Sequence, residues 1–343
     1  MKACLARHCS PKEDIDATLA HAENAFVAGD YRTARTTLLA SIRRNRKYAA
    51  SLPVEVSDLL RAHSRIAAHL GEKENYLAGA RDVAGALKAG LPANDPRILD
   101  ARIEIGDSQA GIGNITTAVD IYRSVIKQAD RYGLPQTAAY ARLRIANLYS
   151  ALAESDRSYR QPTTRELDEL AALTDPGLSR FAAAARVLKA RAAASRGDMS
   201  AINHLIAGLK AAGETTPILL YAPPLVAPVR PGSSQLQQNT LSRMQMSKVD
   251  DQWVDIGFWI GADGKVGDIE ILRESPTLSG RWVEPVKKAI AGRRYAPFTP
   301  QAGKSGMQRV ERYTLTAFWT TPLGSRMRVR EPETRIEMLD LTS

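Results

Sequence analysis

Hydrophobic positions in the first part of the chain recur with the spacing of helices. Tyr31, Ala34 and Leu38 follow one another at steps of three and four residues. The same steps return after Gly113 and after Gly197. Because such steps place side chains on one face of an α-helix, we expect amphipathic helices here and not strands.

The helical patterns are punctuated by a repeat of 42 residues. Gly29, Gly71, Gly113 and Gly197 are separated by multiples of this period, and Ser155 fills the missing step. Glycine often ends a helix, because it adopts the left-handed backbone conformation without strain. We therefore expect residues 14–213 to form about ten helices in five pairs, with a longer turn near Ser155.

A single helical hairpin cannot bury its apolar face, so consecutive hairpins are expected to stack into a solenoid. The sequence Gly29-Asp30-Tyr31, followed by Ala34, resembles the tetratricopeptide repeat in a longer, 42-residue form. The resemblance implies an all-α helical-hairpin solenoid that binds a protein or a peptide. A purely structural spacer is the alternative.

A different pattern begins after residue 213. Prolines crowd residues 214–248, which we interpret as a Pro-rich and polar linker. Apolar and polar residues then alternate over 254–260, as in a half-buried strand. Asp263 and Gly264 predict a hairpin turn to a second strand, Val266 to Leu272. A short helix, Trp282 to Ala291, and a third strand, Val310 to Trp319, complete an antiparallel α+β pattern.

This part of the chain resembles the C-terminal domain of TonB-type energy transducers. The resemblance is carried by the strand-turn-strand run Trp253 to Glu274 and by Arg293-Arg294-Tyr295-Ala296-Pro297 after the helix. It implies a small TonB C-terminal-like α+β domain over 249–322. It also implies that Tyr295 covers the junction of helix and sheet and that Pro297 starts an extended stretch.

The resemblance further implies that the last strand receives an extended partner segment. The candidate partner-binding residues are Val310, Arg312, Tyr313, Thr314, Thr316 and Phe318. In the competing interpretation, the tail 323–343 adds an edge strand and already covers this position with Ile336 to Leu341. We favour the covered edge, because a bare apolar strand of this length would promote aggregation.

Charge and composition narrow the classes of partner. The formal net charge is +10, but basic and acidic residues are interleaved, so we expect no nucleic-acid partner. No apolar run is long enough for a membrane span, and the N-terminal segment 1–13 lacks the apolar core of a signal peptide. Cys4 and Cys9 lie close together there and predict a local disulfide or two free thiols.

The sequence contains no recognisable catalytic, phosphate-binding or metal-binding motif. We therefore expect a non-enzymatic protein without cofactor or metal. The TonB resemblance implies an envelope protein of the periplasm, whose partners include an outer-membrane or other envelope protein. No membrane anchor is visible, so energy transduction by this chain alone is not expected. The alternative is a cytoplasmic scaffold or assembly protein without a transport role.

Overall fold

The computed structural model describes residues 2–210, 216–225, 252–278, 282–321, 326–331 and 333–342. It divides into two units. The first consists of Met1–Ala68 and Glu72–Arg186, and the second of His69–Gly71 and Val187–Ser343. The division therefore falls inside a helix, well before the boundary predicted at residue 213.

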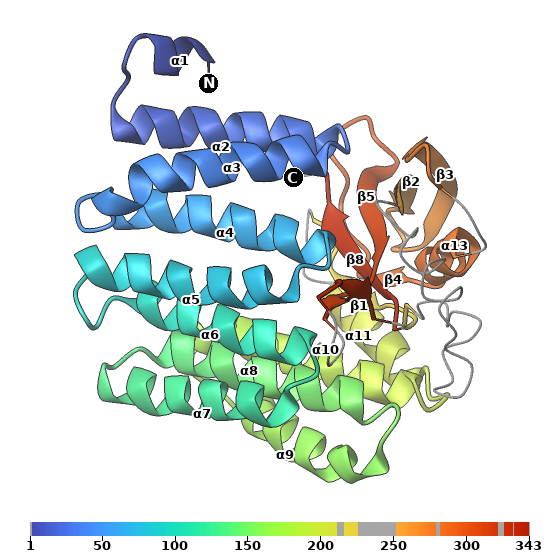
Figure 1. Cartoon of the computed structure of the whole chain (residues 1–343). Helices are drawn as coiled ribbons and strands as arrows, with labels where there is room; N and C mark the ends of the chain where they lie inside the picture. The colour runs from blue at the N-terminus through green and yellow to red at the C-terminus, as the bar shows by residue number, and fades with distance from the viewer. Residues whose placement is uncertain are drawn as a thin grey trace. The chain divides into compact units, whose positions relative to one another are not determined.

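Ten helices, α2 to α11, occupy the region where the sequence predicts five pairs (Figure 1). The prediction is confirmed within the described residues, and a short extra helix, α1, precedes the array. The bounds are α1 Lys2–Ala6, α2 Pro11–Val27, α3 Tyr31–Asn45, α4 Pro53–His69, α5 Lys73–Gly90, α6 Pro96–Gly111, α7 Ile115–Arg131, α8 Pro135–Leu152, α9 Arg160–Ala171, α10 Ser179–Ala194 and α11 Ser200–Lys210.

Four of the five hairpin turns share one backbone geometry. Gly29, Gly71, Gly113 and Gly197 have φ values of 82°, 69°, 85° and 93°. In each turn, the residue after the glycine donates its N–H to the carbonyl five residues earlier; in the third turn Asn114 bonds to Gln109 over 2.9 Å. This pattern closes a helix and reverses the chain. The periodic glycines therefore mark the turns, as the sequence predicts.

The fourth turn differs, because it has no glycine at the corresponding position. α8 ends at Leu152 and α9 begins only at Arg160, with a 3-10 helix over Arg157–Tyr159 between them. Here the Asp156 N–H donates to Leu152, four residues back, over 2.8 Å. The expected longer turn is therefore present.

Close helix packing in the first unit depends on a small residue and a shared carboxylate. A Cβ at Gly106 of α6 would lie 2.4 Å from the ring of Tyr122 on α7. The Tyr122 hydroxyl donates to Asp107 over 2.6 Å, and the Arg144 guanidinium of α8 donates to the same carboxylate over 2.8 Å. Asp107 thus ties three consecutive helices together beside their common apolar core.

The N-terminal segment is closed by a disulfide between Cys4 and Cys9, whose Cα atoms are 5.2 Å apart. Of the two alternatives that the sequence leaves open, the structure has the bridge. The bridge joins α1 to the residue that precedes the N-cap of α2, Ser10.

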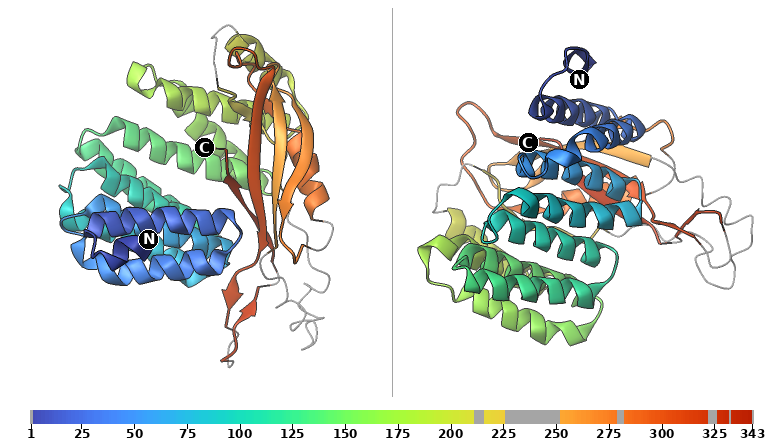
Figure 2. Two further views of the ribbon diagram at one scale, coloured as in Figure 1. Left: turned by 90° about the horizontal axis from the view of Figure 1, so that it is seen from above. Right: turned by 60° about the vertical axis from the view of Figure 1, so that its left-hand side comes forward.

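The second unit contains a four-stranded antiparallel sheet in the order β3-β2-β5-β8, with α13 on one face (Figure 2). Two short strand pairs, β1 with β4 and β6 with β7, form in addition to this sheet. The bounds are β1 Leu219–Tyr221, β2 Gln252–Gly261, β3 Val266–Glu274, α13 Val283–Ala291, β4 Arg294–Tyr295, β5 Gly306–Thr316, β6 Trp319–Thr320, β7 Val329–Arg330 and β8 Arg335–Asp340.

The predicted order of strand, strand, helix and strand is confirmed, but the predicted bounds of the third strand are wrong. The sequence pattern predicts this strand over Val310 to Trp319. β5 instead begins at Gly306 and ends at Thr316, and the backbone leaves the sheet before β6. The early start has a simple reason, because the pairing of β5 with β2 extends to Gly306 opposite Gly261.

The linker interpretation is wrong for part of 214–248. Leu219–Tyr221 forms β1, which pairs antiparallel with β4, and Leu220 is fully buried. Arg191 of α10 donates to the carbonyls of Leu220 and Leu219 over 2.7 and 2.5 Å. These bonds join α10 to β1. The division between the two units accordingly falls within α10 and not at residue 213. Residues 226–248 of the predicted linker lie outside the described part of the chain.

We predict opposite effects of alanine at two exposed glycines in the first unit. Gly113 has positive φ, and no atom lies within 4 Å of the place that a Cβ would take, so Gly113→Ala should cost about 1 kcal/mol from backbone strain alone. Gly85 lies inside α5 with equally open space, so Gly85→Ala should stabilise by about 0.5–1 kcal/mol. Denaturant unfolding followed by far-ultraviolet circular dichroism measures both. A neutral Gly113→Ala would contradict the left-handed turn.

Candidate partner-binding edge

The face of the sheet that carries α13 is the hydrophobic core of the second unit. Every second residue of β2, from Val254 to Ile260, points to this face, together with Tyr313 and Leu315 of β5. They pack against Val286 and Ile290 of α13. The strand predicted over 254–260 is therefore confirmed, but the prediction that it is half-buried is wrong. Asp255 and Gly257, which point to the other face, are buried as well.

The hairpin turn and the Tyr295 segment, which the sequence singles out separately, meet in the structure. Asp263 accepts the Lys265 N–H over 3.1 Å, and this hydrogen bond lowers the pKa of the Asp263 carboxyl. Gly264 has φ 78°, and its carbonyl accepts the Tyr295 N–H over 2.9 Å. A Cβ at Gly264 would lie 2.1 Å from the Tyr295 carbonyl oxygen, so only glycine fits.

Tyr295 lies in β4, and Pro297 follows that strand after one residue. The Tyr295 ring is buried in the core between sheet and helix. Pro297 follows in an extended stretch, where the N–H groups of its neighbours Ala296 and Phe298 donate to Ile218 and Ala262. Because proline lacks an N–H, it leaves no unsatisfied donor between them.

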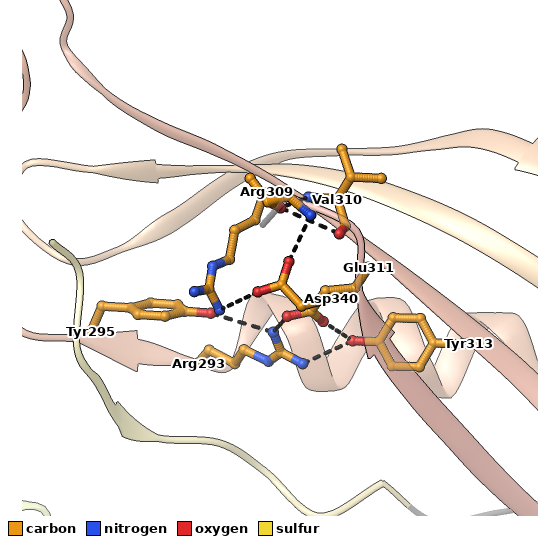
Figure 3. Close-up of polar contacts among 8 residues, drawn as sticks. Arg293, Tyr295, Arg309, Val310, Glu311, Tyr313 and Asp340 are labelled. Carbon is orange, nitrogen blue, oxygen red and sulfur yellow. Dashed lines mark hydrogen bonds and ion pairs between the residues drawn. The ribbon is translucent and has the colours of Figure 1, made fainter. Parts of the chain in front are cut away.

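A buried polar network lies at the end of α13, against β5 (Figure 3). Arg293 donates to Glu311 over 2.8 Å, to the Tyr313 hydroxyl over 2.8 Å and to the Tyr295 hydroxyl over 3.3 Å. The Tyr313 hydroxyl also donates to Glu311. The Arg293 and Glu311 side chains are 7% and 2% exposed. Burial raises the pKa of the Tyr313 phenol far above its ordinary value, and the Glu311 carboxylate raises it further.

The opposite face of the sheet carries a second ion pair. Arg312 of β5 lies directly across from Asp255 of β2 and donates to both of its oxygens, over 2.6 and 2.9 Å. Arg273 of β3 reaches the same carboxylate over 2.7 Å. The Arg312 guanidinium also lies 4.0 Å from the centre of the Trp253 ring. Arg312 is therefore engaged inside the sheet in this conformation.

The tail covers the edge of β5, as the favoured interpretation of the sequence expects. β8 pairs with β5 from Glu311 opposite Asp340 to Thr316 opposite Arg335. Beyond the strand, the Leu341 N–H donates to the Val310 carbonyl and the Val310 N–H donates to the Thr342 hydroxyl, each over 2.8 Å. Arg309 and Asp340 form an ion pair of 3.4 Å at the same end (Figure 3).

β8 differs from the strand that it covers in how little of it is buried. The side chains from Glu311 to Phe318, in β5 and its extension, are all buried. By contrast, every residue of β8 is partly or fully exposed, and Met338 is 48% exposed. Ile336 is the residue of β8 that packs on the edge of the core. Backbone pairing along β5 therefore holds β8 in place together with a few side-chain contacts, such as the Arg335 guanidinium 4.3 Å from the centre of the Phe318 ring.

The six candidate partner-binding residues thus occupy four settings. Tyr313 lies in the core, and Arg312, Thr314 and Thr316 lie on the other face of an inner strand. Val310 is bonded to the tail. Phe318 lies beyond β5, where its carbonyl accepts the Glu331 N–H over 2.7 Å. The backbone of 311–316 becomes accessible to a partner only when β8 leaves.

The sequence pattern does not identify Arg293, Glu311, Arg309 and Asp340 as interacting residues. The contacts join the end of α13, two positions of β5 and the last residue of β8. No periodic pattern links such distant positions. The one usable signal is the spacing of Glu311 and Tyr313, which places both on the core face of a strand and makes the carboxylate conspicuous.

The outer edge formed by β3 is less suitable for strand addition. Its pairing with β2 shifts register twice, and Asp268 has a positive φ of 48°. Charged residues, including Glu270 and Arg273, stand along it. Bulges and charges are common protections of an exposed edge. The edge of β5 that β8 covers, where the pairing is regular, is therefore the better candidate.

The described residues contain no group of three or more His, Cys, Asp or Glu side chains arranged to hold a metal ion. They also contain no helix with the length and hydropathy needed to cross a membrane.

Comparison with solved structures finds helical repeat proteins of low sequence identity. A crystal structure of a single-residue variant from Podosopora anserina, described as a kinesin light chain with nearly identical TPR-like repeats, has a TM-score of 0.44 and 16% identity, covering 59% of this chain and 94% of that one. A second structure with the same description, without the substitution, has a TM-score of 0.42 and 15% identity, covering 59% and 95%. No family model and no curated protein matches the chain.

We predict that breaking the Arg293 network destabilises the second unit strongly. Arg293→Met leaves the Glu311 carboxylate buried without its cation, which should cost about 3–5 kcal/mol. In the double variant Arg293→Met/Glu311→Leu the loss should be much smaller, because no buried charge remains. All four tryptophans lie in the second unit, so intrinsic fluorescence during urea unfolding reports on it. Equal losses in the single and double variants would contradict this account.

Proposed function

We propose that this chain is a non-enzymatic interaction protein of the bacterial envelope. Its sheet unit binds an extended segment of one partner along β5, in the place that β8 holds, and its helical array docks a second partner. The TonB-like identity of the sheet unit is part of this proposal and rests on the sequence resemblance and on the antiparallel sheet with one helix.

One observation carries the proposal: β8, a strand with no fully buried residue, covers the part of β5 that is buried throughout, Glu311 to Thr316. An edge of this kind offers a row of backbone donors and acceptors, and any extended segment can satisfy them. β8 supplies those bonds while contributing little to the core. A partner strand with comparable backbone bonds can therefore compete with it.

Because β8 belongs to the same chain, the competition is unequal. A tethered segment acts at an effective concentration on the order of millimolar. A free partner must overcome this advantage. Its apparent affinity equals its affinity for the uncovered edge multiplied by the small fraction of molecules in which β8 is displaced. The tail thereby sets the threshold for binding and protects the edge from self-association.

The β8 segment itself provides the probe for a test. We predict that a labelled peptide with the sequence of Thr334–Thr342 binds a chain that ends after Glu333. This shortened chain keeps β6 and β7. The full-length chain should bind the peptide at least about tenfold more weakly, because its edge is occupied. Fluorescence anisotropy measures both affinities. Equal, weak binding by the two chains would remove the support for an exchangeable edge.

Two proline variants of the peptide give a matched control. The Leu341 N–H bonds to Val310, so the alternation of an antiparallel ladder directs the Leu339 N–H toward β5 and the Met338 N–H away. Leu339→Pro in the peptide should abolish binding, whereas Met338→Pro should be tolerated. Equal effects would indicate contact through side chains without strand addition.

The envelope location is supported by the Cys4–Cys9 bridge, because disulfides persist in oxidising compartments such as the periplasm. We predict that protein recovered from the periplasm and alkylated without reductant keeps an unmodified intact mass. Reduction should change the unfolding midpoint little, because the bridge closes a short terminal loop. Two alkylated thiols in periplasmic protein would count against this location, and in favour of the cytoplasmic scaffold.

A further inference from the structure

An open groove in the first unit has an unpaired carboxylate in its wall. Its volume is about 870 Å³. One wall is α6, another is α8 with the turn before it, and the start of α10 closes one side. The size is in the range of sites that hold a short peptide or a drug-sized ligand.

The groove combines apolar and polar side chains. Leu134, Pro135 and Leu143 supply apolar surface that is at least partly exposed, and Tyr140 is 38% exposed at the same place. Asp100 stands on the same face of α6 as Ile103, since the two residues are three positions apart. An apolar segment that carries one polar or charged group would fit such a lining.

Asp100 differs from the other charged residues of this region. Glu104 is paired with Arg61 over 3.0 Å, Asp95 with Arg97 over 2.8 Å, and Arg180 donates to Gln136 over 3.0 Å. Among the described residues, the Asp100 side chain has neither a hydrogen bond nor an ion pair. The half-buried Asp100 carboxylate therefore lacks a counter-charge.

The surroundings of Asp100 make this arrangement costly. Burial raises the pKa of the Asp100 carboxyl, and the negative charges of Glu104 and Asp95 raise it further. A cation placed in the groove would relieve both effects. Perturbed carboxylates in clefts are candidate functional groups for this reason.

We propose that this groove docks an extended segment of a partner protein that places a Lys or Arg side chain on Asp100, beside the Tyr140 ring, with apolar neighbours against Leu134, Pro135 and Leu143. The carboxylate supplies charge complementarity, and the exposed aromatic ring favours a cation near its face. The inference rests on the array half of the proposed function, to which it gives a place and a partner chemistry. It does not depend on strand exchange at β5.

The test uses the full chain and two fluorescein-labelled peptides. One is Gly-Ser-Leu-Pro-Leu-Arg-Leu-Phe-Gly, and the other has citrulline in place of Arg, which keeps the shape and removes the charge. Anisotropy titrations to about 1 mM peptide should show binding of the Arg peptide at least about tenfold tighter than that of the citrulline peptide. Equal affinities, or no binding of the Arg peptide, would overturn the proposal.

Matched protein variants locate the site. Asp100→Asn should weaken the Arg peptide about tenfold and leave the citrulline peptide unchanged. Asp120→Asn, an exposed change of the same charge on α7, should alter neither. Tyr140→Ala should also weaken binding, and Tyr140→Phe should restore it. Unchanged binding in Asp100→Asn would overturn the proposal.

Two further measurements separate this inference from folding defects and from the edge proposal. Asp100→Asn should melt at the same temperature as the parent or higher, because it removes an unpaired carboxylate; a lower melting temperature with lost binding would overturn the assignment. Free arginine amide should compete with the labelled peptide only weakly. Competition as strong as that of the unlabelled peptide would show that the groove binds a small cation, and would overturn the proposal that it docks a protein segment. Failure here leaves the binding of the Thr334–Thr342 peptide at β5 unaffected.

Discussion

The second unit depends on the need of β5 to satisfy its backbone groups on both sides. Its buried part, from Glu311 onward, must pair twice, because an unpaired N–H or carbonyl removed from water costs free energy. β2 satisfies one side over ten residue pairs, and β8 satisfies part of the other. The two charge networks are consequences of this central position, since Arg293 reaches β5 from one face and Asp255 meets it on the other. The strand that carries the candidate site is also the strand that holds the sheet together.

Both units contain carboxylates that are paired by neighbouring side chains, and Asp100 differs from them. In the sheet unit, the buried carboxylates of Glu311 and Asp255 are each paired with a guanidinium. In the array, the Asp107 carboxylate accepts hydrogen bonds from Tyr122 and Arg144. Asp100 lies about two helical turns earlier on α6 and has no such partner among the described residues. On the same helix, therefore, Asp107 is paired and Asp100, in the wall of the groove, is not.

The sequence predicts those features whose cause is local. Gly29, Gly113 and Gly197 could be identified because a left-handed turn requires glycine, and β2 could be identified because its core-facing apolar residues recur at every second position. The features that the sequence does not predict depend on contacts between residues far apart in the chain. β1 lies inside the predicted linker because prolines surround Leu219–Tyr221, while the bonds from Arg191 that hold it come from a helix far earlier in the chain. The groove likewise combines side chains from α6, α8 and α10, which no periodicity relates.

The irregular fourth turn has a practical consequence for protein engineering. Ser155, Asp156 and Arg157 are exposed, and no glycine there is required for a tight reversal. Surface turns of this kind accept additional chain more readily than tight ones. A fluorescent protein or an affinity tag inserted at this position would leave the C-terminal strand undisturbed, which matters for a molecule whose tail forms part of its own sheet.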